Sequence, residues 1–316
     1  MNVSIIIPVK PGGFVAAVES LRNLVPSAVG YEVLIAEGRR PSRQRNMAAR
    51  EAVGEVVYFL DDDSCVVPDA LVRIAAHMRD DSVAVVGGPS LTHADNSPFQ
   101  RSVAWVLASA FGGGAIRNRY RKHGSLRDTD DSELILCNLA FRKDIFLSSG
   151  GLDERLYPNE ENELIDRLLA GGFRLLHDPE LFVTRSQRPT LRAFVRQMLT
   201  YGNGRAEQTL VSRRVDAKAI IPSLFVLYLM SLPVFHVWWY LLPAALYLVI
   251  VLGNMLMASR TEGFSLVWRL PVIYTLLHAC YGAGFISGLF SPRYKKCDSP
   301  CDDVNIVRLK AVDSDW

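Results

Sequence analysis

Short apolar runs alternate with amphipathic stretches over the first hundred residues. Four of these runs are typical of buried strands, at 3–9, 31–36, 56–60 and 83–86. Between them, the spacing of apolar positions predicts helices at about 13–24, 43–53 and 68–79. Strands that alternate with helices in this way indicate βαβ units and a mostly parallel sheet. We therefore expect an α/β fold in this part of the chain.

The pattern is looser beyond residue 100 but still predicts regular elements. We expect helices at about 99–111, 160–170 and 189–211, and strands at 134–137 and 173–177. The last of these helices is amphipathic and precedes a change in the character of the chain.

No Asp, Glu, Lys or Arg occurs from Ala219 to Ser259, and a second uncharged run extends from Leu270 to Pro292. The first run would be about 62 Å long as a helix, roughly twice the thickness of a bilayer core. Gly284 and Gly288 have the spacing that lets membrane helices approach closely. We expect a cytoplasmic domain, two to three spans and a polar tail, divided as 1–212, 213–292 (spans at about 219–236, 237–258 and 270–291) and 293–316.

Charge indicates the orientation in the membrane. Lys and Arg exceed Asp and Glu by far between Arg185 and Lys218, which predicts a cytoplasmic N-terminal domain at the inner membrane. The first residues lack the pattern of a signal peptide. Three crossings would place the tail outside, whereas Arg293, Lys295 and Lys296 favour the inside, so both arrangements stay open.

Composition excludes several classes of protein. The net charge is only +2, from 35 basic and 33 acidic side chains, and the basic residues gather beside the apolar segments. Nucleic-acid binding is therefore not expected. The five cysteines are too scattered for a zinc site, and Cys297 and Cys301 are either free thiols or, in an oxidising compartment, a disulfide.

Asp61, Asp62 and Asp63 directly follow the apolar strand at 56–60. The carboxyl ends of parallel strands are where such sheets bind ligands, and Pro8 and Glu37 follow neighbouring strands. Clustered carboxylates repel one another and suggest a hard cation, because Mg²⁺ is typically held by one or two carboxylates and substrate phosphates. The alternative is a solvated turn that caps the next helix.

A second acidic cluster, Asn159-Glu160-Glu161-Asn162-Glu163, begins the helix predicted at 160–170. Carboxylates in a first helical turn are favoured by the helix dipole whatever their function. Taken alone, this cluster is better explained as a helix start than as a catalytic site.

The motifs taken together resemble a family 2 glycosyltransferase with the GT-A fold. Ser4-Ile-Ile-Ile-Pro-Val9, Gln44-Arg45-Asn46 and Phe59-Leu-Asp-Asp-Asp63 look like its nucleotide-sugar half. Asn138-Leu-Ala-Phe-Arg142, Gly150-Gly-Leu-Asp153 and the 159–163 cluster look like its acceptor half. Arg196-Gln197 with Tyr201-Gly-Asn-Gly-Arg205, ahead of apolar segments, is most similar to succinoglycan-type exopolysaccharide glycosyltransferases. The resemblance covers roughly residues 3–290.

The resemblance implies roles for individual residues. Pro8, Val9 and Glu37 would contact the nucleotide, although the family usually has Asp in place of Glu37. Arg45 would lie near the diphosphate, where a permanent cation suits the leaving group. Asp63 and Asp61 would hold Mn²⁺ or Mg²⁺, with Asp61 also near the ribose and Asp62 in a supporting role.

In the acceptor half, Glu161 matches the catalytic Asp of the family and would be the general base, with Glu160 as the alternative. The Gln-x-x-Arg-Trp motif of processive relatives is altered, because Thr200 and Tyr201 follow Gln197 at those positions. Processive synthesis is therefore disfavoured. The resemblance leaves Asn138, Gln197 and Tyr201 as candidate acceptor contacts.

The implied activity is an inverting transfer of a sugar from a nucleotide-diphosphate donor, with a UDP-sugar favoured, to a hydroxyl of a lipid-linked saccharide in polysaccharide synthesis. A polyprenyl-diphosphate carrier suits the arginines ahead of the apolar segments. Two alternatives stay open. A polyprenyl-phosphate glycosyl synthase would use an ionised phosphate as nucleophile, and a non-catalytic membrane protein would only bind the nucleotide sugar.

Overall fold

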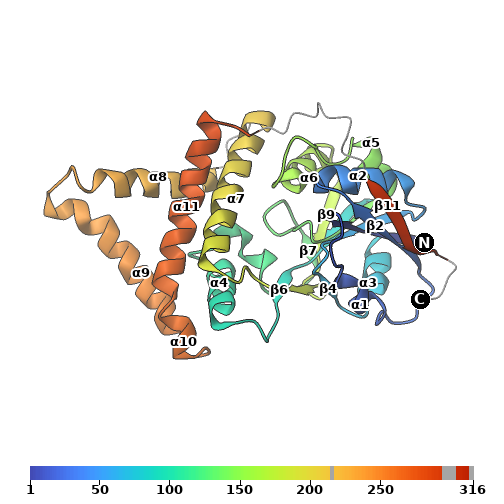
Figure 1. Ribbon diagram of the computed structural model, residues 1–316, viewed down its shortest axis with the longest axis horizontal. Coiled ribbons are helices and arrows are strands. Elements are labelled where there is room, and N and C mark those ends of the chain that lie inside the picture. Colours follow the sequence, from blue (N-terminus) through green and yellow to red (C-terminus); the bar gives the residue numbers. More distant parts are fainter. Residues whose placement is uncertain (214–216, 294–303, 313–316) are drawn as a thin grey trace. The chain divides into compact units, whose positions relative to one another are not determined.

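The computed structural model describes residues 1–213, 217–293 and 304–312. The chain forms two compact units (Figure 1). The first contains residues 1–91, 118–185 and the C-terminal strand, and the second contains residues 92–117 and 186–293. These boundaries differ from the predicted division at residue 212. Cys297 and Cys301, like Lys295 and Lys296, lie outside the described residues.

The first unit is built on an eight-stranded mixed sheet with the strand order β11-β2-β1-β3-β8-β5-β9-β7. Strands β2, β1 and β3 run parallel, β5 is parallel to β9, and β8 is antiparallel to both of its neighbours. The strands are β1 (Asn2–Val9), β2 (Gly30–Glu37), β3 (Val56–Leu60), β5 (Val83–Gly87), β7 (Arg127–Asp128), β8 (Asn138–Arg142), β9 (Arg174–His177) and β11 (Asn305–Lys310).

Helices cover both faces of this sheet, which explains why its strands are continuously apolar. Ile5 and Ile7 pack into a core with α1 and α3, while Ile6 packs into a second core with α2, α5 and α6. These two sets of helices lie on opposite faces of the sheet (Figure 1). The helices are α1 (Ala17–Leu21), α2 (Pro41–Glu51), α3 (Ala70–His77), α5 (Lys143–Ser148) and α6 (Glu160–Ala170).

A small second sheet borders the first unit, with the order β4 (Cys65–Val66), β10 (Val183–Arg185) and β6 (Ser90–Thr92). β10 runs antiparallel to β4, with Thr184 opposite Cys65. This pairing brings Arg185 next to the turn that follows β3. The strand expected at 134–137 lies instead at β8, and the helix expected at 13–24 is reduced to α1.

Within the predicted polar tail, β11 pairs antiparallel with β2 from Asn305 opposite Glu37 onward. The guanidinium of Arg308 on this strand lies 2.8 Å from Oε2 of Glu32, a side chain with 0% exposure. The other carboxylate oxygen of Glu32 accepts hydrogen bonds from Ser4 Oγ and from the backbone N–H of Val53, each at 2.6 Å. The strand thus supplies the cation that a buried carboxylate requires.

The second unit is helical. Its elements are α4 (Pro98–Ala108), η1 (Gly114–Arg119), α7 (Leu191–Ser212), α8 (Ala217–Ser231), η2 (Trp238–Leu241), α9 (Leu242–Ala258), α10 (Phe264–Val267) and α11 (Leu270–Phe290). α7 and α11 lie side by side (Figure 1). A Cβ atom on Gly284 would lie 2.3 Å from the Leu199 carbonyl oxygen, and one on Gly288 would lie 2.8 Å from that of Asn203. The predicted role of these glycines in close helix packing is confirmed.

Two helical segments, Trp238–Ala258 and Phe264–Phe290, are long and apolar enough to cross a membrane, while Ile220–Ser231 is shorter. Many of their large apolar side chains are exposed within this unit, including Trp238 at 76% and Met230 at 70%. Water disfavours such surfaces, so they point to an apolar environment. Of the three predicted spans, the one at 219–236 is the shortest in the structure.

Candidate functional site

Three carboxylates gather at the carboxyl end of β3, where the sequence predicted them. The strand is fully buried as far as Leu60, and the chain then turns sharply at Asp61. The backbone N–H of Asp61 donates to Ser64 Oγ at 3.2 Å, and that of Ser64 donates to the Asp61 carbonyl at 3.1 Å. This turn holds Asp61, Asp62 and Asp63 together. Burial, followed by the charges of Asp63 and Asp61, raises the pKa of Asp62.

Arg45 connects this turn to the second acidic cluster. Its Nη2 donates to Oδ1 of Asp61 at 2.6 Å, and its Nη1 lies 3.5 Å from Oε1 of Glu160. The guanidinium is almost fully buried, yet its Nε and Nη1 have no hydrogen-bond partner among the described residues. Buried donors without acceptors are rare in folded proteins, and here they mark a place where an anionic ligand fits.

Arg185 approaches the same carboxylates from β10. Its Nε donates to Oδ1 of Asp63 at 2.7 Å, and its Nη1 lies 2.9 Å from Oδ2 of Asp61. The guanidinium therefore sits between the two aspartates and is 22% exposed. Sequence reasoning counted Arg185 only among the basic residues that precede the apolar segments and missed its place in the site.

Glu160 and Glu161 begin α6, as the motif predicted. Glu160 is 2% exposed, and burial, reinforced by the charge of Glu161, raises its pKa to about 8 although Arg45 opposes the shift. Its Oε2 has no hydrogen-bond partner among the residues described. Glu161 is only half-buried, so the two neighbours differ sharply in their access to solvent.

α2 organises the site through three consecutive buried polar side chains. Gln44 donates to the carbonyls of Val9, at 2.9 Å, and Ala36, which lie at the ends of β1 and β2. Arg45 contacts the acidic residues as described above. Asn46 donates to the Leu152 carbonyl at 2.8 Å and accepts from its N–H at 2.9 Å. The single helix α2 thereby fixes the ends of β1 and β2, the acidic residues that Arg45 contacts, and the loop before α6.

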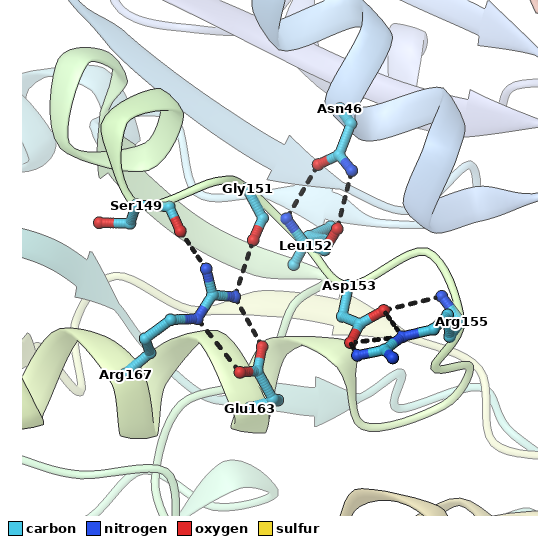
Figure 2. A network of polar contacts seen from close by, with 8 residues as sticks. All are labelled: Asn46, Ser149, Gly151, Leu152, Asp153, Arg155, Glu163 and Arg167. Atoms are coloured by element: carbon cyan, nitrogen blue, oxygen red, sulfur yellow. Dashed lines mark hydrogen bonds and ion pairs between the residues drawn. The ribbon is translucent and has the colours of Figure 1, made fainter. Parts of the chain in front are cut away.

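That loop is further held by a network of polar contacts (Figure 2). Arg167 on α6 pairs with Glu163 at 2.6 Å and donates to the carbonyls of Ser149 and Gly151. Gly151 has φ of +69°, a conformation that favours glycine. The Gly-Gly-Leu-Asp segment and the start of α6 are thus tied to each other, which positions Glu160 and Glu161.

Pro8 and Val9 end β1, and Glu37 ends β2 beside them. Oε1 of Glu37 accepts a hydrogen bond of 2.6 Å from the N–H of Gly12, in the turn after β1. The three predicted nucleotide contacts are thereby brought to the same edge of the sheet as the aspartates.

A sequence model for "Glycosyl transferase family group 2" matches residues 56–287. This span includes the aspartate turn, β8, α6 and the long helices. The chain belongs to this family.

Curated relatives of this family 2 chain are also glycosyltransferases or polysaccharide-synthesis proteins. A pre-mycofactocin glycosyltransferase of Mycobacterium tuberculosis is 25% identical over 233 residues, which cover 65% of this chain and 47% of the relative. The succinoglycan biosynthesis protein ExoA of Rhizobium meliloti is 28% identical over 228 residues, or 63% of this chain and 66% of ExoA. The chain thus spans about half the length of the first relative.

Among solved structures, the mannosyltransferase PcManGT from Pyrobaculum calidifontis, in complex with GDP-Man and Mn²⁺, has a TM-score of 0.50 and 15% identity. The alignment covers 92% of this chain and 87% of that one. The expected GT-A fold of this α/β unit is confirmed.

The three predicted acceptor contacts are not brought together within one unit. Asn138 has 0% exposure, accepts from Tyr58 Oη at 2.6 Å and donates to the Leu181 carbonyl at 2.6 Å, which gives it a structural role. Gln197 and Tyr201 lie on α7 in the second unit and form a hydrogen bond of 2.9 Å with each other.

The predicted metal ligands fit a divalent cation poorly. In the part of the chain that the structure describes, no group of three or more His, Cys, Asp or Glu side chains forms a metal-binding set. Asp61 and Asp63 converge, but Arg185 contacts both carboxylates and Arg45 contacts one of them. The guanidinium of Arg185 thus bridges the two carboxylates that the sequence predicted as metal ligands.

Proposed function

We propose that this chain transfers a sugar from a nucleotide-diphosphate donor, with a UDP-sugar favoured, to a hydroxyl of a lipid-linked saccharide, with inversion at the anomeric carbon. The observation that carries the proposal is Arg45, which joins the aspartate turn to Glu160 and keeps two buried N–H donors without acceptors. Family membership supports the class of reaction.

The reaction needs a base and a stabilised leaving group. The acceptor oxygen attacks the anomeric carbon, its proton passes to Glu161, and the bond to the nucleoside diphosphate breaks with the electron pair on the departing phosphate. Glu161 suits the base because it is only half-buried and an acceptor can reach it. Arg45 faces the leaving group, where charge develops and a fixed guanidinium stabilises it.

The second unit offers a place for an anionic carrier. A cavity of about 300 Å³ between α7 and α11 is lined by Arg192, Arg196 and Arg293, together with Thr200 and Asn203. Among the residues that line it, three are arginines and none is acidic, so the cavity favours an anionic group. We propose that it holds the diphosphate of a polyprenyl-linked saccharide.

The C-terminal strand bears on the membrane topology. β11 follows the apolar helices in the sequence yet belongs to the sheet of the catalytic unit. A chain that leaves one side of a membrane and returns to it crosses an even number of times, which agrees with two helices of sufficient length. α8 would extend only about 22 Å, short of the ~30 Å hydrocarbon core. We propose that tail and catalytic unit are both cytoplasmic at an inner membrane.

Substitution of the two glutamates tests the mechanism. Glu161→Gln should lower kcat by about 10²- to 10⁴-fold, because it removes the base. Glu160→Gln serves as the matched neighbour and should retain most of the activity. A large loss only in Glu160→Gln would transfer the base role to Glu160. Retained activity in both variants would favour an ionised phosphate acceptor, as in a polyprenyl-phosphate glycosyl synthase.

A further inference from the structure

Arg185 holds the aspartate turn in the way a bound cation would. Two of its nitrogens contact two different carboxylates, Asp63 at 2.7 Å and Asp61 at 2.9 Å. The contact depends on the pairing of β10 with β4, since Arg185 is 122 positions from Asp63 in sequence. The guanidinium of Arg185 is a planar fork of N–H donors with a permanent positive charge, and strand β10 holds it in place before any ligand binds.

Two guanidiniums already contact the carboxylates of the turn. Arg45 and Arg185 lie within 2.9 Å of Asp61 and Asp63, and Asp62 is the third acidic side chain of the turn. A divalent cation between Asp61 and Asp63 would meet the guanidinium of Arg185 at close range, where like charges repel strongly. This repulsion opposes the binding of Mg²⁺ or Mn²⁺ between these two carboxylates.

The same guanidiniums suit the ligand that a metal would otherwise bind. Arginine forks match phosphate oxygens in pairs, and Arg45 has two buried N–H groups free to donate. We propose that Arg185, with Arg45, is the built-in cation of the donor site, and that it binds the diphosphate without a divalent metal. This inference rests on the proposed function, because it assumes a nucleotide-diphosphate donor.

A surface arginine provides a matched control. Arg174 also bridges two carboxylates, with Asp80 at 2.7 Å and Asp128 at 2.9 Å, but it is 45% exposed. Arg174→Ala thus removes a two-point ion pair of the same geometry outside the candidate site. Arg185→Lys keeps the charge without the fork, and it guards against a loss of folding in Arg185→Ala.

The experiment measures the Kd of UDP and of GDP by calorimetry for the full chain in nanodiscs, with EDTA or with Mn²⁺. We expect the wild type to bind one nucleotide with the same Kd in both conditions. In EDTA, Arg185→Ala should bind about 10- to 100-fold more weakly, Arg185→Lys should be intermediate, and Arg174→Ala should be unchanged. Added Mn²⁺ should restore binding in Arg185→Ala alone, which a purely structural role of Arg185 would not produce.

Asp63→Asn supplies a second, independent reading. Its amide oxygen can still accept from Arg185, so nucleotide binding in EDTA should persist, whereas the loss of a carboxylate charge should weaken a site that depends on a divalent metal. Binding by the wild type only when Mn²⁺ is present, or loss of binding in Asp63→Asn, would overturn the built-in cation. Failure of both nucleotides to bind under every condition would instead overturn the proposed function, and this inference with it.

Discussion

Arg45 is the side chain on which the candidate site depends most. It is buried, it contacts acidic residues from two separate motifs, and part of its donor capacity is unused. A lysine at this position would keep the charge but could not contact Asp61 and Glu160 together, because it lacks the planar fork.

We therefore expect Arg45→Lys to weaken nucleotide binding by about tenfold or more, in line with the loss of one charge-assisted hydrogen bond. Arg50→Lys, on the exposed side of the same helix, is the control and should bind normally. Calorimetric titration with UDP measures both. Equal affinities for the two variants would remove Arg45 from the donor site.

Glu160 makes the stability of the first unit depend on pH. Its pKa is raised from an ordinary 4.5 to about 8, mainly by burial, so the folded state favours the neutral form. The folded protein thus binds a proton that the unfolded chain releases between these two values. This contribution to stability is complete below about pH 4.5 and is lost as the pH rises to about 8.

Glu160→Gln should flatten that dependence, because glutamine stays neutral. Thermal unfolding from pH 5 to 9 should show a smaller fall in Tm for this variant than for the wild type. Glu51→Gln, at an exposed position, should follow the wild type. Parallel curves for all three proteins would mean that Glu160 ionises normally.

Residues of the site differ in how far the sequence predicts them. The sequence predicts Asp61 to Asp63 because they follow the end of a strand, and it predicts Glu160 and Glu161 because they begin a helix. Both signals are local. Arg185 is different, because only the pairing of β10 with β4 brings it to the aspartates from a distant part of the chain. The role of Asn138 is not specified by its position in the sequence, since a polar residue after an apolar run can serve the core as well as a ligand.

At the level of elements, the strands and helices with strong periodicity were predictable, and the short ones were not. β11 was missed because six residues at the end of a polar segment carry little pattern, and their partner β2 lies at the other end of the chain. The same holds for β4 and β10, whose pairing depends on tertiary contacts.

The ion pair between Arg308 and Glu32 should be the main attachment of β11. Arg308→Ala leaves a fully buried carboxylate without its cation, and we expect the free energy of unfolding of the first unit to fall by about 1–3 kcal/mol. The partial exposure of Arg308 places the value below that of a fully buried pair. Denaturant unfolding measures the change.

The double variant Glu32→Gln, Arg308→Ala supplies the control for this prediction. It removes the stranded charge and should recover part of the lost stability. Simple additivity of the two single changes would show that the side chains do not interact.

For the whole molecule, the return of the chain to its first sheet constrains the path through a membrane. The charges near the apolar segments leave the side of the tail open, whereas strand pairing connects β11 to the sheet of the first unit. Two crossings agree with the pairing of β11 with β2. They also agree with a cytoplasmic position of the basic residues that precede the helices.

Reporter fusions test this topology. Green fluorescent protein fused after Val312 should fluoresce, and alkaline phosphatase fused at the same position should be inactive. The corresponding fusions at the N-terminus should give the same two results. Active phosphatase at the C-terminal position alone would place the tail on the opposite side and exclude the β11–β2 pairing in the membrane-bound protein.

Sugar transfer itself is the measurement that distinguishes an enzyme from a protein that only binds a nucleotide sugar. The full chain in nanodiscs, supplied with a polyprenyl-linked saccharide extract, is incubated with a panel of radiolabelled UDP-sugars and other nucleotide sugars. We expect label from one donor to enter the lipid fraction with the wild type, and we expect this transfer to be lost with Glu161→Gln. Donor binding without transfer to any acceptor would contradict this expectation and indicate a protein that only binds nucleotide sugars.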